Sequence, residues 1–205
     1  MDPLFESSWD RIWPALGAAG RGHAVRDAVL QGYAEPHRRY HTLQHLAECL
    51  TLLAEVRDAA DHPDEVEMAL WFHDAVYALR ASDNEARSAE WAAEALRSAG
   101  VSVPVVERVR ALILATQHKA LPQSRDAQVL VDVDLSILGA PPERFAEYEV
   151  QIRQEYAHVP GFLFRLKRRA ILQSFLDRPA LFSTPRLHQR LEARARANLA
   201  AAVAG

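Results

Sequence analysis

Hydrophobic side chains recur every three or four positions along most of the chain, and alanine, leucine, glutamate and arginine dominate these stretches. The segment 187–203 is an example, because one helical face collects its apolar side chains: Leu187, Leu191, Ala195, Leu199 and Val203. The alternating β-branched stretches that are typical of strands are short. The pattern predicts an all-α protein.

Residues that break helices interrupt this pattern repeatedly. The breaks fall at 17–22, 35–36, 62–63, 81–83, 100–104, 121–122, 139–142, 160–161 and 184–185. Two helix starts carry capping residues: Ser82 with Glu85 matches a capping box, and Thr42 is expected to cap a helix that runs to Val56. The segments between the breaks predict about nine or ten helices.

Length and composition fit one domain that covers residues 1–205. Hydrophobic residues make up 49% of the chain and charged residues 25%, as in an ordinary globular protein. No spacer rich in glycine, serine or proline separates two parts, and no sequence period repeats. We therefore expect a single helical domain with a substantial core.

Cysteine content and charge narrow the setting. The only cysteine is Cys49, so no intramolecular disulfide is possible, which fits a reducing compartment. The net charge of −3 gives no general attraction to nucleic acid. Residues 1–6 do not resemble a signal peptide, and no segment approaches the ~20 apolar residues of a membrane span. We expect a cytoplasmic protein that uses neither membrane nor nucleic acid as a partner.

The first candidate for chemistry is a histidine on a hydrophobic helix face. His45 shares this face with Cys49, Leu52 and Val56, so it is expected to point into the core. His41 precedes it by one turn, at the mouth of the same helix.

The second candidate is a histidine followed directly by an aspartate. His73 falls on a helical face that is hydrophobic between residues 66 and 77, and Asp74 is next to it. A buried carboxylate needs a hydrogen-bond donor, such as His73, or a cation. Two further carboxylates, Asp132 and Asp134, follow later, and imidazoles with carboxylates suit a divalent ion such as manganese, iron or zinc. The set predicts a metal site.

This ordered set resembles the HD superfamily of metal-dependent phosphohydrolases, which combine an isolated histidine, a His-Asp pair and a final aspartate on separate helices of a bundle. The chain is most similar to a bacterial subgroup of the same length, whose recurring segments correspond to 40–45, 72–77, 83–85, 132–139 and 153–156. The resemblance implies an HD-type bundle with a metal-binding core at about 38–140 and C-terminal helices, 141–205, packed on it. It also implies that His45, His73, Asp74 and a later aspartate bind the metal.

Two aspartates compete for the last ligand position. Asp132 follows the hydrophobic run 129–131, as the final aspartate of the family does. Asp134 shares a helical face with hydrophobic residues and is expected to be the more buried of the two. Both stay candidates, with a slight preference for Asp132.

Further candidates surround the expected metal. Glu85 could orient or deprotonate the attacking water, although its place in the capping box is also a sufficient role. His41 and His118 could contact phosphate or a second metal, although a histidine such as His118 at a helix C-terminus also interacts favourably with the helix dipole.

Three cations, Arg39, Lys119 and Arg153, could neutralise phosphate charge, or be solvated or structural side chains. The resemblance predicts hydrolysis of a small phosphorylated substrate, with a nucleotide as the expected class, by water activated on a divalent ion (Mn, Fe, Zn, Mg or Ni). The alternatives are a non-catalytic metal or nucleotide sensor and a di-iron HD-type oxygenase. The last helix could also support a homodimer.

Overall fold

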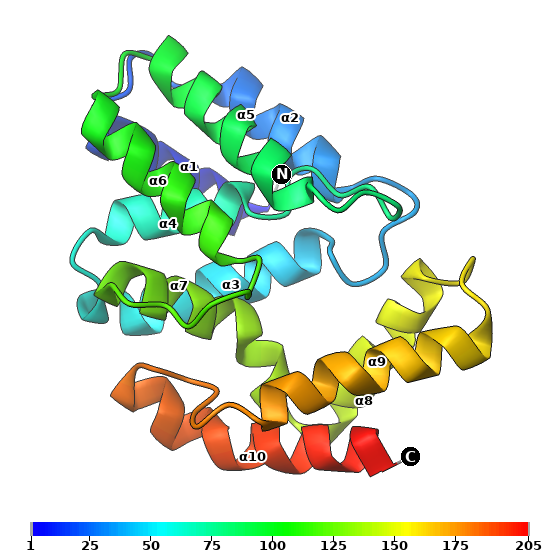
Figure 1. The fold of residues 1–205 in the computed structure, drawn as a ribbon. Helices are drawn as coiled ribbons and strands as arrows, with labels where there is room; N and C mark the ends of the chain where they lie inside the picture. The colour runs from blue at the N-terminus through cyan, green and yellow to red at the C-terminus, as the bar shows by residue number, and fades with distance from the viewer. Residues whose placement is uncertain (1, 205) are drawn as a thin grey trace. The chain divides into compact units, whose positions relative to one another are not determined.

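The protein is all-helical. The computed structural model describes residues 2–204, and within that range the chain forms ten α-helices, two short 3-10 helices and no strand, which confirms the all-α prediction (Figure 1). The described chain divides into two compact units, one that ends at Val131 and one that begins at Asp132. None of the described helices is long and apolar enough to cross a membrane.

The first unit contains most of the helices. They are α1 (Pro3–Ala15), α2 (His23–Tyr33), α3 (Leu43–Val56), η1 (Arg57–Ala59), α4 (Pro63–Phe72), α5 (Asn84–Ser98) and α6 (Val103–Ala115), followed by α7 (Arg125–Asp134), which ends in the second unit. Helices α5 and α6 lie side by side, and α4 packs against α1, α3, α5 and α6 (Figure 1). Helix α4 is therefore the centre of this unit.

Helix α4 is buried on every side from Glu65 to Phe72. Because no face meets water, its sequence has no polar stripe, as expected for an interior helix. On the α1 side, Trp71 packs edge-on against Trp9 with ring centroids 5.0 Å apart, and its Nε1 donates to Ser8 Oγ at 2.9 Å. The end of this helix is consequently packed against its neighbours on all sides.

Two carboxylates of α4 are buried and paired with arginines. Glu65 accepts two hydrogen bonds from Arg108, at 2.8 and 2.7 Å. Glu67 accepts from Arg11 at 2.6 and 2.7 Å and from Arg57 at 2.5 Å. Buried carboxylates paired in this way avoid an unfavourable isolated charge, so these acidic residues serve the fold.

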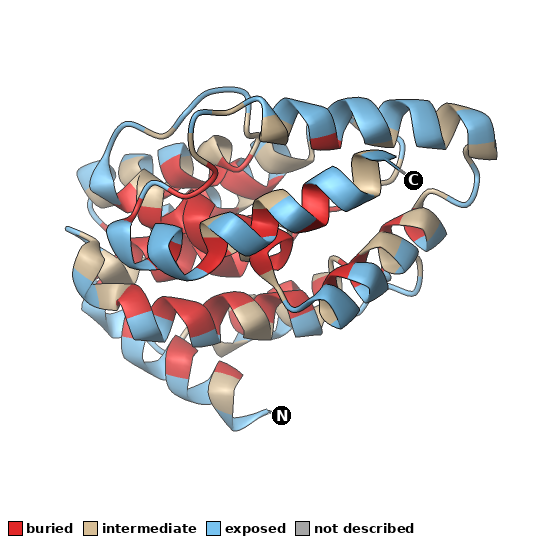
Figure 2. Ribbon diagram, turned by 90° about the horizontal axis from the view of Figure 1, so that it is seen from below, coloured by how far each residue is buried: buried red, intermediate tan, exposed pale blue. Residues whose placement is uncertain are grey.

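The second unit is built from η2 (Leu135–Gly139), α8 (Pro142–Glu155), α9 (Gly161–Leu176) and α10 (Pro185–Ala204). Helix α10 packs against η2 and α9. At Gly139 an added Cβ would lie 2.7 Å from Leu191 Cβ, so glycine permits the close approach of η2 to α10. Along α10, which alternates between buried and exposed residues in Figure 2, four residues of the predicted stripe are buried: Leu187, Leu191, Ala195 and Leu199.

The helix boundaries agree with the sequence at most places. Each predicted break coincides with a connection or with an end of a helix. Thr42 caps α3 as expected, because its hydroxyl accepts from Gln44 N at 3.3 Å and the helix runs to Val56. The single-domain arrangement and its boundary at about residue 140 stay predictions.

The predicted capping box of α5 is wrong. The N-cap of this helix is Asp83, whose side chain makes no capping hydrogen bond. The neighbouring Asn84 side chain turns back to the preceding loop, where it accepts from Ala78 N at 3.0 Å and donates to Ala78 O at 3.1 Å. The start of α5 therefore fixes the loop after α4.

Candidate metal centre

Helix α3 carries His45 into the interior of the first unit. The Thr42 cap sets the start of the helix, so His45 falls on the face that also buries Leu46, Cys49 and Leu53. His45 itself is buried, as the sequence predicted. A histidine in this position can offer a ring nitrogen to a partner that also lies inside the unit.

His73 and Asp74 follow the last residue of α4 rather than continuing it. The sequence predicted a helical face through residue 77, but α4 ends at Phe72. The cause is that backbone groups beyond this point bind side chains from elsewhere: Val76 N donates to Ser88 Oγ at 3.0 Å, and the Asp74 carbonyl accepts from Arg38 at 2.6 Å. The pair therefore lies in a turn.

This turn and helix α3 bring three side chains together. The Nε2 atoms of His45 and His73 lie 3.0 Å apart. Asp74 Oδ2 lies 3.1 Å from His73 Nε2 and 3.6 Å from His45 Nε2. These atoms form a nearly equilateral triangle, and the three residues form a group that could hold a metal ion.

The triangle has the dimensions expected around one divalent ion. Ligand bonds of about 2.1 Å place neighbouring ligand atoms roughly 3.0 Å apart at right angles and roughly 3.4 Å apart at tetrahedral angles. The two histidines are almost inaccessible, whereas 16% of the Asp74 side chain is exposed, so the carboxylate marks the side open to solvent. Two imidazoles and one carboxylate fit manganese, iron or zinc with free positions left for water.

Contacts on the other side of the imidazole, at Nδ1, orient His73. Its Nδ1 lies 2.8 Å from the Leu70 carbonyl oxygen, which can only accept, so Nδ1 carries the hydrogen and Nε2 presents a lone pair. The hydroxyl of Tyr33 lies 3.4 Å from the same Nδ1 and accepts from Asp74 N at 3.3 Å. Ligating histidines are commonly oriented by such a carbonyl partner.

The electrostatic setting keeps Asp74 ionised. Burial opposes its charge, but the neighbouring imidazoles of His73, His41 and His45 outweigh that effect and hold the pKa of the Asp74 carboxyl well below its usual range. Burial also raises the pKa of Tyr33, so this phenol stays neutral. An anionic carboxylate between imidazoles is the charge state that a cation requires.

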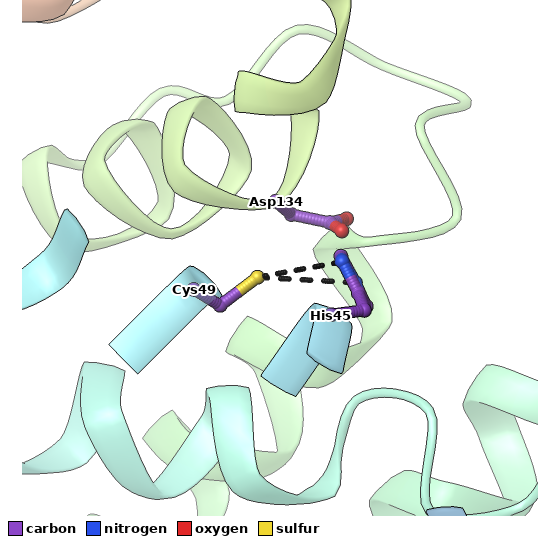
Figure 3. Close-up of side chains that lie close together, drawn as sticks. All are labelled: His45, Cys49 and Asp134. Atoms are coloured by element: carbon purple, nitrogen blue, oxygen red, sulfur yellow. Dashed lines mark hydrogen bonds between the residues drawn. The ribbon is translucent and has the colours of Figure 1, made fainter. Parts of the chain in front are cut away.

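Cys49 lies beside His45. Its Sγ is 3.8 Å from both ring nitrogens of His45, as the dashed lines in Figure 3 indicate. Asp134, also drawn in Figure 3, belongs to the second unit. The thiol is buried and lies on the same face of α3 as His45.

The two candidates for the final aspartate differ in a way that the helical pattern did not predict. Asp132 is fully buried, whereas Asp134 is partly exposed, so the predicted order of burial is wrong. The Asp132 carboxylate accepts hydrogen bonds of 2.7–2.9 Å from the backbone N–H groups of Ser183 and Thr184 and from the Thr184 hydroxyl. Asp132 therefore caps the start of α10. The carboxylate oxygens that accept these hydrogen bonds are the same atoms that would bind a metal.

Of the remaining candidates, His41 lies near the triangle. Its ring centroid is 6.0 Å from that of His45 and 4.2 Å from that of Tyr77, on which it stacks. Glu85 lies in the first turn of α5 and is half-buried. His118 follows the end of α6 with a left-handed backbone (φ 54°). Contacts of Glu85 or His118 with the triangle stay predictions.

The three candidate cations differ in their surroundings. Arg39 is exposed and donates to the carbonyls of Pro36 and Arg38, at 2.9 and 3.2 Å. Lys119 is exposed. Arg153 donates to the carbonyls of Tyr156 (2.6 Å) and Val159 (3.2 Å), and so closes the end of α8. A role of these residues in substrate binding stays a prediction.

Sequence reasoning missed Arg38, which is only 2% exposed and contacts the His73–Asp74 turn. Arg38 lies in the connection between α2 and α3, where no periodic pattern of hydrophobic residues predicts which side chains are buried. The next residue, Arg39, is also an arginine but is exposed. No sequence signal distinguishes the two.

Compared with models of protein families, with curated proteins and with solved structures, the chain matches none of them.

Proposed function

We propose that the protein is a metal-dependent phosphohydrolase of the HD type that acts on a small phosphorylated molecule. The observation that carries this proposal is the triangle of His45 Nε2, His73 Nε2 and Asp74 Oδ2, with sides of 3.0, 3.1 and 3.6 Å. Its members match the isolated histidine and the His-Asp pair of the sequence resemblance, in that order along the chain.

The roles of the residues follow from their surroundings. His45 and His73 would hold the cation with their Nε2 atoms, and Asp74 would be the third ligand on the accessible side. The cation, when bound, would activate water for attack on phosphorus and offset the negative charge of the phosphoryl group. Asp74 would also accept a proton, and His41, whose ring centroid lies 6.0 Å from that of His45, would donate a hydrogen bond to a phosphate oxygen.

The substrate class rests on the resemblance. We propose a nucleotide as the substrate and the cytoplasm as the location of the protein. One of the later aspartates, Asp132 or Asp134, would be the fourth metal ligand. Asp132 and Asp134 both stay candidates for that position, and Asp132 has a structural role as well, because it accepts hydrogen bonds from Ser183 and Thr184.

A second candidate function has a specific observation in its favour. Two histidines and one carboxylate that leave coordination positions open are also the ligand set of non-haem iron oxygenases. The structure of the triangle is compatible with either chemistry, so the identity of the metal and the reaction must be measured together.

The test is metal analysis of the purified protein combined with phosphate release from a panel of nucleotides and phosphomonoesters in added Mn²⁺. The variants are His73→Ala and Asp74→Asn, and the matched control is His23→Ala, which changes a half-buried histidine that pairs with Asp10 at 2.9 Å. We expect metal content and phosphate release to be lost in both site variants and kept in the control.

Other outcomes separate the alternatives. Metal retained by His73→Ala would contradict the ligand assignment. Iron that is bound without phosphate release, together with oxygen consumption, would favour the oxygenase, and bound metal with no turnover of either kind would favour a sensor.

A further inference from the structure

We propose that Arg38 is a positioning residue that fixes the spacing between the two metal-binding segments of the candidate centre, an inference that rests on the function proposed above. Arg38 lies in the connection between α2 and α3, and its side chain is buried. A buried guanidinium must find acceptors for its charge and for all its N–H groups. The acceptors that it uses are the basis of the proposal.

Each of the five N–H groups of Arg38 has an acceptor. Nε and Nη2 donate to Glu35 Oε2 at 3.1 and 3.0 Å. Nη1 donates to the carbonyl oxygens of His41 at 3.2 Å and of Asp74 at 2.6 Å, and Nη2 also donates to that of Ala75 at 3.1 Å. The charge is balanced by Glu35, and the remaining donors all hold backbone.

The backbone that Arg38 holds belongs to both ligand segments. The His41 carbonyl stands just before Thr42, the cap of the helix that carries His45. The carbonyls of Asp74 and Ala75 belong to the turn that carries the other two ligands. One planar group therefore joins the start of α3 to the end of α4.

Two neighbouring aromatic rings and a glycine restrict the orientation of the Arg38 guanidinium group. The guanidinium carbon lies 5.3 Å from the ring centroids of both Tyr33 and Tyr77. At Gly32 an added Cβ would lie 2.6 Å from the Ala75 carbonyl oxygen and 3.8 Å from Arg38 Nη2. Only a residue without a side chain lets α2 approach this carbonyl so closely.

The consequence for the centre is geometric. The triangle requires an imidazole of α3 and the His73–Asp74 pair to stay within 3.0–3.6 Å of one another. Lysine carries the same charge as arginine but has donors at a single point, so it cannot reach three carbonyls and a carboxylate at once. Without the guanidinium group we expect the chain to fold, but the distances between His45 and the His73–Asp74 pair would no longer be held at these values.

The experiment is a calorimetric titration of the metal-free full chain with Mn²⁺, and in parallel with Zn²⁺, for wild type and Arg38→Lys. We expect Arg38→Lys to bind about 10–100-fold more weakly, as is typical when a residue that supports metal ligands is changed. The matched control is Arg196→Lys, because Arg196 also holds backbone carbonyls, those of Leu176, Arg178 and Pro179, within the second unit. The control is expected to keep the wild-type affinity.

A second variant covers the case in which Arg38→Lys does not fold. Glu35 is 45% exposed and anchors Arg38 from the solvent side, so Glu35→Ala is expected to fold and to weaken metal binding by roughly several-fold. Wild-type affinity in a folded Arg38→Lys protein, or in Glu35→Ala, would overturn the positioning role, even if thermal stability fell. Absence of binding in wild type would instead refute the proposed function itself.

Discussion

The Nε2 atoms of His45 and His73 lie 3.0 Å apart although 28 positions separate the two residues in the sequence. Two nitrogen lone pairs at this distance repel each other, so a hydrogen or a cation must lie between them. Since Nδ1 of His73 donates to the Leu70 carbonyl, its Nε2 has no hydrogen in the neutral ring. Asp74 Oδ2, which is also an acceptor, lies 3.1 Å from the same Nε2, so the metal-free protein must carry a hydrogen on Nε2 of at least one of the two rings.

This arrangement predicts where the ring hydrogens lie. In the metal-free protein, nitrogen-15 NMR spectra of the histidine rings are expected to show a hydrogen on Nδ1 of His73 and a hydrogen on Nε2 of at least one of the two rings. Addition of Zn²⁺ should remove the hydrogen from Nε2 and leave Nδ1–H of His73 in place. A spectrum in which Nδ1 of His73 carries no hydrogen would contradict the ligand geometry.

Asp132 is expected to contribute to the stability of the second unit. Asp132→Ala would leave the backbone N–H groups of Ser183 and Thr184 without their acceptor, at a cost of about 2 to 3 kcal/mol in the free energy of unfolding. Its affinity for Mn²⁺ is compared with that of Asp134→Asn, since one of the two aspartates is the proposed fourth ligand. A loss of affinity in one variant alone would identify that aspartate, and unchanged affinity in both would contradict a fourth aspartate ligand. Urea unfolding and Mn²⁺ titration measure the two quantities.

The pH dependence of stability is expected to include a contribution from Asp126. Burial opposes its charge, but hydrogen bonds from His62 and Asp61 lower the pKa of the Asp126 carboxyl below the ordinary value of 3.8. The contribution is therefore present above pH 3.8 and is lost as the pH falls through the lower, folded-state pKa.

The test compares Asp126→Asn with wild type by urea unfolding at several pH values. At pH 7 the variant should be less stable by about 1 to 2 kcal/mol, and the difference should shrink as the pH falls below about 4. Asp177→Asn, at an exposed position, is the control and should show little change at any pH. A difference for Asp126→Asn that does not depend on pH would contradict the role of its charge.

Gly32→Ala is expected to destabilise the protein although alanine is the better helix former by about 1 kcal/mol. The new methyl group would meet the Ala75 carbonyl oxygen, which Arg38 holds, so backbone has to move at a net cost of about 1 to 3 kcal/mol. Thermal unfolding measures the change. Gly161→Ala is the control, because its added Cβ would lie no closer than 3.6 Å to Arg165, and it should be nearly neutral.

The sequence by itself determined the helical architecture and part of the centre. Thr42 and the hydrophobic face that follows fix the bounds of α3 and turn His45 inward, because a cap and a helical period are local properties. The stripe along α10 was readable for the same reason. The pairing of His73 with Asp74 follows from their adjacency.

Only the tertiary structure decided where α4 ends and what holds the ligand turn. The helix stops at Phe72 because Arg38 and Ser88, 36 and 12 positions away from their partners, bind the backbone of the turn. Asp132 was misjudged because its hydrogen-bond donors lie 51 and 52 positions later in the chain. Such contacts depend on how helices pack, and a periodic pattern carries information about the direction of a side chain but not about the partner that meets it.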